Sequence, residues 1–96
     1  MITIIAKNLI KQGKTEEFKA LSKELINQSR KEKGNISYNL YEDTTDSNIL
    51  TFIEQWQDKE AINLHNNSAH FTSIVPKFAE LKQGQSMINL YKILGE

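Results

Sequence analysis

The spacing of apolar residues changes from a strand pattern to a helix pattern within the first third of the chain. Residues 1–9 are rich in β-branched side chains and predict a strand. Thr15 offers an N-cap for a helix that we expect to span residues 15–32. One face of this helix is apolar and consists of Phe18, Leu21, Leu25 and Ile26. Gly34 follows a basic run and is the expected end of the helix.

The middle of the chain predicts a β-hairpin. Residues 36–43 alternate between two faces, as the residues of a strand do. The side chains expected on one face are Ile36, Tyr38 and Leu40. Residues 43–48 are dense in turn formers, and residues 49–56 predict the second strand of the hairpin.

The last third predicts an interrupted helix and a final strand. Asp58 can cap the helix, which we expect to break or bend near residues 66–68. Pro76 cannot continue the hydrogen-bond ladder, so it marks a kink or a new first turn. Gly84 ends this region, and residues 87–94 form the last predicted strand.

The predicted order of elements is β-α-β-β-α-β, the ferredoxin-like arrangement of the α+β class. We expect one domain over residues 1–96, a length near the lower range for independent folding. Both faces of the predicted strands carry apolar side chains, whereas two helices can cover only one face of a four-stranded sheet. A second copy of the sheet would cover the other face, so the sequence predicts a homodimer.

Composition argues against several classes of protein. Basic and acidic residues number 12 each, so the net charge is zero and a basic nucleic-acid surface is not expected. No run approaches the roughly 18 apolar residues of a membrane span, and no secretory signal pattern is present. The absence of cysteine excludes disulfides, thiolate metal sites and a cysteine nucleophile. These features lead us to expect a cytoplasmic protein.

Residues 52–71 form the chemically richest stretch of the chain. They contain the only tryptophan, Trp56, and both histidines, His65 and His70. Glu54 lies on the same predicted strand face as Trp56. A carboxylate, an indole and two imidazoles around one strand-to-helix connection could build a small-molecule pocket.

Three motifs of the chain match a known family: residues 34–43 (GNISYNLYED), residues 52–56 (FIEQW), and His65 with Ser68, His70 and Phe71. In these motifs the chain resembles the antibiotic biosynthesis monooxygenase (ABM) family, of the small bacterial quinol monooxygenase type. The resemblance covers essentially the whole chain. It implies a dimeric α/β barrel of two sheets packed face to face, with a pocket in each subunit. Some members oxidise quinol or polycyclic substrates with dioxygen and without metal, flavin or haem, so no cofactor is expected.

The resemblance also implies roles for individual residues. His65 occupies the family's recurrent histidine position, and an imidazole titrates near physiological pH, so His65 is the expected proton acceptor. Asn8 resembles an asparagine whose amide hydrogen-bonds a substrate oxygen or a peroxy intermediate. The residues expected to bind the substrate are Trp56, His70, Phe71, Tyr38 and Glu54.

Each of these residues also has a structural interpretation. His65 could be a surface or capping residue, and Asn8 could serve the turn after the first strand. A tryptophan at the position of Trp56 is more often a core or interface anchor than a reactive group. Glu54 would be a costly buried charge unless it is paired, and it could position a histidine or anchor a helix terminus.

The separation of the two histidines sets the expectation for metal binding. In an unbroken helix, five residues turn His70 about 140° away from His65. Zinc-binding helices instead place their histidines four residues apart. A kink near Asn67 could bring the rings together, but no metal site is expected.

The leading hypothesis is a cofactor-independent monooxygenase acting on a quinol or a related small aromatic compound. One alternative is a non-catalytic dimeric module for ligand binding or stress. Another is a proton-transfer isomerase of a small carbonyl compound, in which Lys7 and Lys11 could bind a phosphate group of the substrate. Haem degradation is disfavoured, because His65 stands where haem-degrading relatives carry a tryptophan, and an apolar residue near Val75 replaces their histidine.

Overall fold

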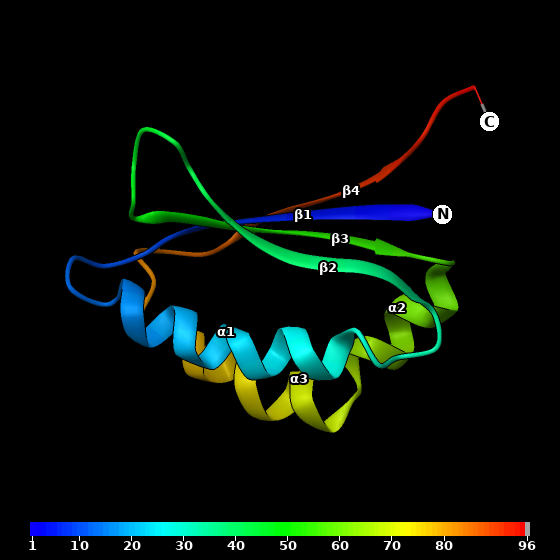
Figure 1. Cartoon of the computed structure of the whole chain (residues 1–96), viewed down its shortest axis with the longest axis horizontal. Coiled ribbons are helices and arrows are strands. Elements are labelled where there is room, and N and C mark those ends of the chain that lie inside the picture. Colours follow the sequence, from blue (N-terminus) through cyan, green and yellow to red (C-terminus); the bar gives the residue numbers. More distant parts are fainter. Residues whose placement is uncertain (96) are drawn as a thin grey trace.

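The computed structural model describes residues 1–95, which form one antiparallel sheet with all helices on one side of it (Figure 1). The four strands are β1 (Ile2–Leu9), β2 (Asn35–Glu42), β3 (Ile49–Trp56) and β4 (Met87–Lys92). Their order across the sheet is β2-β3-β1-β4, so β2 and β4 are the edges. This arrangement confirms the predicted ferredoxin-like α+β fold.

The helical layer is built from three α-helices and a short 3-10 helix. These are α1 (Thr15–Ser29), α2 (Lys59–Asn66), α3 (Ala69–Ile74) and η1 (Val75–Phe78). The predicted break near residues 66–68 is confirmed, because the Ser68 hydroxyl accepts a hydrogen bond from the Phe71 backbone and starts α3 as a new helix. Pro76 lies at the start of η1, where its missing N–H leaves no bond unmade. Asp58 caps α2 as predicted, accepting from the Ala61 amide at 2.9 Å.

The core lies between the helices and one face of the sheet. On the central strands this face carries Ile4, Ala6, Asn8, Leu50, Phe52, Glu54 and Trp56. Phe18 of α1 and Phe78 of η1 stack at 4.3 Å between ring centroids and cover the middle of this face. Both rings are buried, so the apolar stripe predicted for α1 does face the sheet.

The structure corrects the predicted N-cap and the predicted C-terminal end of α1. Lys14, not Thr15, is the N-cap residue, and it makes no side-chain cap hydrogen bond. At the other end α1 stops at Ser29, because residues 29–35 continue as single turns instead of helical bonds. Gly34 is not the helix stop and has an ordinary backbone conformation. A Cβ at this position would lie 2.3 Å from the Cβ of Ala61, so the close approach to α2 requires glycine there.

Two strand predictions also need correction. A β-bulge between Asn35 and Ser37 shifts the register of β2, and Ile36 is 55% exposed instead of sharing the inner face with Tyr38. The last strand ends at Lys92, two residues earlier than predicted, because its pairing partner β1 begins at Ile2.

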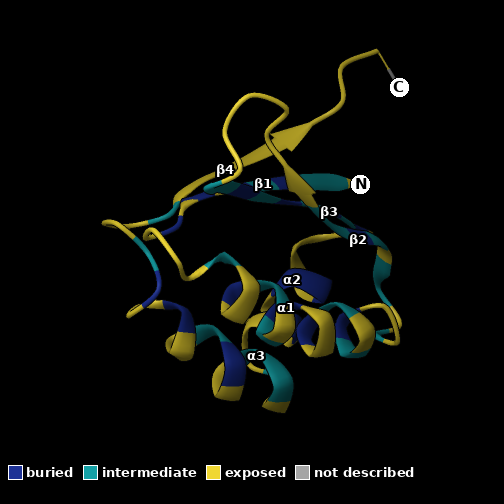
Figure 2. Cartoon of the chain, turned by 60° about the vertical axis from the view of Figure 1, so that its left-hand side comes forward, coloured by how far each residue is buried: buried dark blue, intermediate teal, exposed yellow. Residues whose placement is uncertain are grey.

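Apolar side chains remain uncovered on the outer face of the sheet and along β4. Figure 2 shows β4 as exposed over its length. On the outer face the exposed apolar residues are Leu9, Tyr41, Met87 and Tyr91. Within residues 1–95, no helix has the length and hydropathy needed to cross a membrane.

Candidate functional site

A cavity of about 220 Å³ lies between the inner face of the sheet and the helices. Its wall includes five of the residues that the sequence singled out, namely Asn8, Tyr38, Glu54, His65 and Phe71. Most of the remaining wall is apolar and comes from Ile4, Ala6, Leu25, Phe52, Val75, Phe78 and Ile88. The cavity therefore combines a hydrophobic interior with a few polar groups, as small-molecule sites do.

His65, on the last turn of α2, is the most deeply buried of the polar wall residues, with only 1% of its surface exposed. Three aromatic rings surround its imidazole. The centroid distances are 4.5 Å to Trp56, 5.1 Å to Phe71 and 5.4 Å to Tyr38. This packing fixes the plane of the imidazole ring.

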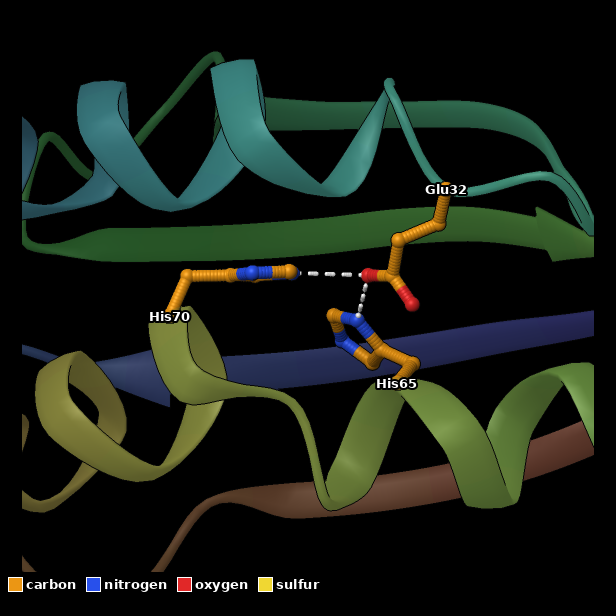
Figure 3. Close-up of side chains that lie close together, drawn as sticks. All are labelled: Glu32, His65 and His70. Carbon is orange, nitrogen blue, oxygen red and sulfur yellow. Dashed lines mark hydrogen bonds and ion pairs between the residues drawn. The ribbon is translucent and has the colours of Figure 1, made fainter.

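Glu32 determines which ring nitrogen of His65 carries the proton. One carboxylate oxygen of Glu32 lies 2.6 Å from Nδ1 of His65 and 2.8 Å from Nε2 of His70 (Figure 3). An ionised carboxylate offers only acceptors, so both histidine nitrogens must carry hydrogen and donate. His65 in its neutral form then has an unprotonated Nε2.

The other ring nitrogen of His65, Nε2, has a different environment. Nε2 of His65 is buried, and no hydrogen-bond partner for it exists among the described residues. Burial lowers the pKa of His65, although the nearby charge of Glu32 opposes this effect. The imidazole is therefore neutral near pH 7, with a lone pair available as a base.

Glu54 is a second titratable group in the cavity wall. Burial raises the pKa of Glu54 to about 7, against the effect of Trp56, whose indole N–H donates to the carboxylate at 3.0 Å. Burial, followed by the charge of Glu54, also raises the pKa of Tyr38 far above its usual range. The Tyr38 hydroxyl thus stays protonated, while Glu54 exchanges a proton near neutral pH.

Asn8, Ser86 and Lys82 form a hydrogen-bonded polar cluster in the cavity wall at the end of β1. The Asn8 amide nitrogen donates to the backbone carbonyls of Ala6 and Leu50, at 3.2 and 3.1 Å. Its side-chain oxygen accepts from the Ser86 hydroxyl, which in turn accepts from the Lys82 ammonium at 2.7 Å. The amide that we expected to face the substrate is therefore directed to the backbone, and Lys82 supplies the positive charge in the wall.

The register of β1 and β3 places Glu54 and Asn8 far apart in the cavity wall. Glu54 pairs with Ile4, whereas Asn8 lies four residues further along β1. At about 3.4 Å per residue this places Glu54 and Asn8 roughly 14 Å apart along the strand direction. Ala6 and Phe52 pair between them and keep the middle of the cavity apolar.

Two expected substrate-binding residues lie outside the cavity wall of residues 1–95. Trp56 is fully buried and supports the wall from behind, through its contacts with His65 and Glu54. His70 contacts Glu32 instead. The lysines considered for phosphate binding, Lys7 and Lys11, are exposed and do not line the cavity either.

Sequence reasoning missed Glu32, Lys82 and Ser86. Glu32 stands in a run of basic residues and looks like a solvated surface charge. Lys82 and Ser86 flank a glycine turn, and Ser86 reaches Asn8 across 78 residues of sequence. No local pattern marks such contacts, because only the sheet topology brings the start of β4 beside the end of β1.

Comparisons with known proteins link the chain to a family. The family model described as "Antibiotic biosynthesis monooxygenase" matches residues 1–77. A Synechocystis protein of unknown function is 40% identical to this chain over 94% of the chain's length. The matched region covers 62% of the length of the Synechocystis protein. The Bacillus subtilis protein "Putative monooxygenase YcnE" is 38% identical over 84% of this chain and 85% of its own length.

Solved structures show the same fold. A conserved protein from Methanosarcina mazei Go1 superposes with a TM-score of 0.93 at 37% identity, over 95% of this chain and 90% of that one. A crystal structure of an antibiotic biosynthesis monooxygenase has a TM-score of 0.93 at 29% identity, over 98% of this chain and 99% of its own. With its fold and most of its length matched in this way, the chain belongs to the antibiotic biosynthesis monooxygenase family.

Proposed function

We propose that this protein is a cofactor-independent monooxygenase that oxidises a small quinol or a related electron-rich aromatic compound. The observation that carries the proposal is the state of His65. Its Nδ1 is held by Glu32, its Nε2 is unpartnered, and its ring lines an apolar cavity. Membership of the family and the name of the Bacillus subtilis relative support the reaction type.

The size and polarity of the cavity favour a small aromatic substrate. An apolar cavity of about 150 Å³ can hold benzene, so 220 Å³ suits about one substituted ring. Polar groups near the two ends, with an apolar middle, match a ring that carries oxygen atoms on opposite sides. Larger polycyclic substrates would need the cavity to widen.

The chemistry begins with proton removal. Nε2 of His65 takes the proton from a substrate hydroxyl, and Glu32 stabilises the imidazolium that forms. The resulting phenolate gives up an electron to dioxygen far more readily than the phenol does. The quinol supplies all four electrons: the O–O bond breaks, one oxygen atom replaces a ring hydrogen, the other leaves as water, and the ring becomes a hydroxylated quinone. Glu54 is placed to return or accept a proton as the reaction proceeds.

The two alternatives make different demands on the same cavity. A purely ligand-binding module would be favoured if both histidines were solvent-exposed and no closed cavity lay beside Trp56, but His65 is buried and His70 is half-buried. A proton-transfer isomerase would use His65 in the same way, yet it would not consume oxygen. Oxygen dependence therefore separates the two enzymatic hypotheses.

The test is oxygen uptake with reduced monocyclic quinols as substrates. Wild-type protein should accelerate uptake over the spontaneous rate, and His65→Ala should lower the enzymatic rate by about 10²–10⁴-fold. Asn63→Ala, an exposed change on the same helix, should retain the wild-type rate. Equal oxygen uptake with and without protein would sink the proposal, and anaerobic turnover of a carbonyl substrate would favour the isomerase.

We also propose that the protein is a homodimer whose subunits pack through the outer faces of their sheets. The uncovered apolar residues on that face, including Tyr41, Met87 and Tyr91, support this assembly. Light scattering at micromolar concentration should give twice the mass of one chain. Tyr91→Glu should lower the mass to that of a monomer, whereas Leu64→Glu, on the helical side, should not. A folded wild-type monomer at this concentration would contradict the proposal.

A further inference from the structure

We propose that Glu32, His65 and His70 form a binding site for a divalent transition metal such as Zn²⁺ or Co²⁺. One oxygen of Glu32, Nδ1 of His65 and Nε2 of His70 all lie within 4.8 Å of one another. The three side chains come from different segments and converge on one point (Figure 3). Two imidazoles and one carboxylate are a ligand set that zinc and its neighbours accept.

The helix break makes this convergence possible. In a continuous helix the two histidines would point about 140° apart. The chain instead leaves α2 at Asn66 and restarts at Ala69, with Ser68 as the cap of α3. The two imidazole centroids consequently lie 5.9 Å apart. From the sequence, a kink near Asn67 could bring the two rings together, but no metal site is expected; the break between α2 and α3 does bring them together.

The third ligand is well placed to adapt to a metal. The present separations of 2.6 and 2.8 Å are hydrogen-bond distances. Ligands about 2.1 Å from a tetrahedral metal lie about 3.4 Å from each other, so the carboxylate has to move outward slightly. Glu32 can do so, because it lies on a turn after α1 and not within a helix.

Solvent reaches this site without passing through the cavity. The side chains of Glu32 and His70 are 16% and 17% exposed, and neither lines the cavity wall. Three protein ligands leave a further coordination position for water, as in zinc sites that are not closed. A metal can therefore reach these ligands without passing through the cavity.

Metal binding reverses the tautomer of His65. When Nδ1 coordinates a metal, the remaining proton of the neutral ring must reside on Nε2. That nitrogen is the base of the proposed oxidation, so a bound metal would inhibit turnover. This consequence rests on the proposed function, whereas the binding site itself does not.

The binding test uses Co²⁺, whose visible absorption reports coordination by nitrogen and oxygen ligands without any assay of activity. Wild-type protein should bind one Co²⁺ per chain with a saturable absorption change, and Zn²⁺ should displace it. His70→Ala and Glu32→Gln should each weaken binding at least about tenfold. Glu60→Gln, which alters an exposed carboxylate on α2, should bind as the wild type does.

The outcomes separate the two proposals. Absence of Co²⁺ absorption in the wild type, or equal affinity in His70→Ala, overturns the metal site. Circular dichroism checks the folding of each variant, and His70→Asn, which preserves polarity at a half-buried position, replaces His70→Ala if that variant unfolds. Co²⁺ binding without any quinol oxidation in the metal-free protein overturns the proposed function and leaves the metal site standing.

Discussion

Nδ1 of His65 lies 2.6 Å from a carboxylate oxygen of Glu32, although the two residues are 33 positions apart in the sequence. This contact orients the imidazole and determines which of its nitrogens carries the proton. It joins the turn after α1 to the end of α2. Much of the chemistry that we assign to the cavity depends on this pair.

Glu32→Gln should lower kcat for quinol oxidation by about 100-fold or more, with little change in KM. The amide can both donate and accept, so it no longer enforces one tautomer of His65. Long-range proton–nitrogen NMR should show a single tautomer of His65 in the wild type and a mixture in the variant. A lower kcat with an unchanged tautomer would argue against a positioning role.

Glu54→Gln should stabilise the protein in alkaline solution but not in acid. Burial raises the pKa of Glu54 from 4.5 to about 7, so the folded chain holds a proton that the unfolded chain has already released. The stability from this proton is fully present below pH 4.5 and is lost as the pH rises through 7. The lost contribution reaches about 3 kcal/mol above pH 8.

Urea unfolding at pH 4.5 and pH 8.5 measures this difference. The variant should match the wild type at the lower pH, because glutamine resembles the neutral carboxylic acid in shape and keeps an acceptor for the Trp56 indole. It should exceed the wild type in unfolding free energy at the higher pH. An equal gap at both pH values would show that Glu54 does not titrate between them.

Ser68→Ala should destabilise the junction between α2 and α3. The hydroxyl accepts from the Phe71 amide and donates to the carbonyl of His65 at 2.7 Å. Losing an N-cap of this kind costs about 1 kcal/mol, which chemical denaturation can resolve. Ser73→Ala is a matched control on α3, since its exposed hydroxyl makes only one long bond, and its effect should stay within about 0.5 kcal/mol.

Gly34→Ala should lower the unfolding free energy by about 1–3 kcal/mol. The added methyl group would lie 2.3 Å from the Cβ of Ala61, so β2 and α2 have to move apart. A double-mutant cycle provides the check. In the background of Ala61→Gly, which removes the clashing atom, adding Gly34→Ala should cost much less. A cost that is unchanged by Ala61→Gly would place the strain elsewhere.

The elements with strong local signals could be predicted from the sequence. The β-branched first strand, the apolar stripe of α1, the Asp58 cap and the interruption at residues 66–68 all lie where the sequence placed them. The spacing of apolar residues and the presence of capping residues depend only on neighbours a few positions away, so both can be recognised in a single sequence. The C-terminal end of α1 and the sheet face of Ile36 were predicted wrongly. Ile36 lies outside the inner face because a bulge in the pairing of β2 with β3 shifts the register there, which no local pattern marks.

The candidate site divides in the same way. The sequence by itself determined which side chains could do chemistry: the two histidines, the indole and the buried carboxylate on one strand face. Only the tertiary structure decided that Glu32 serves both histidines, that Trp56 lies behind the cavity wall, and that Ser86 reaches Asn8. The hydrogen bonds of Glu32 and Ser86 join segments 33 to 78 residues apart. Their distances depend on how the helices pack against the sheet, which no local pattern encodes.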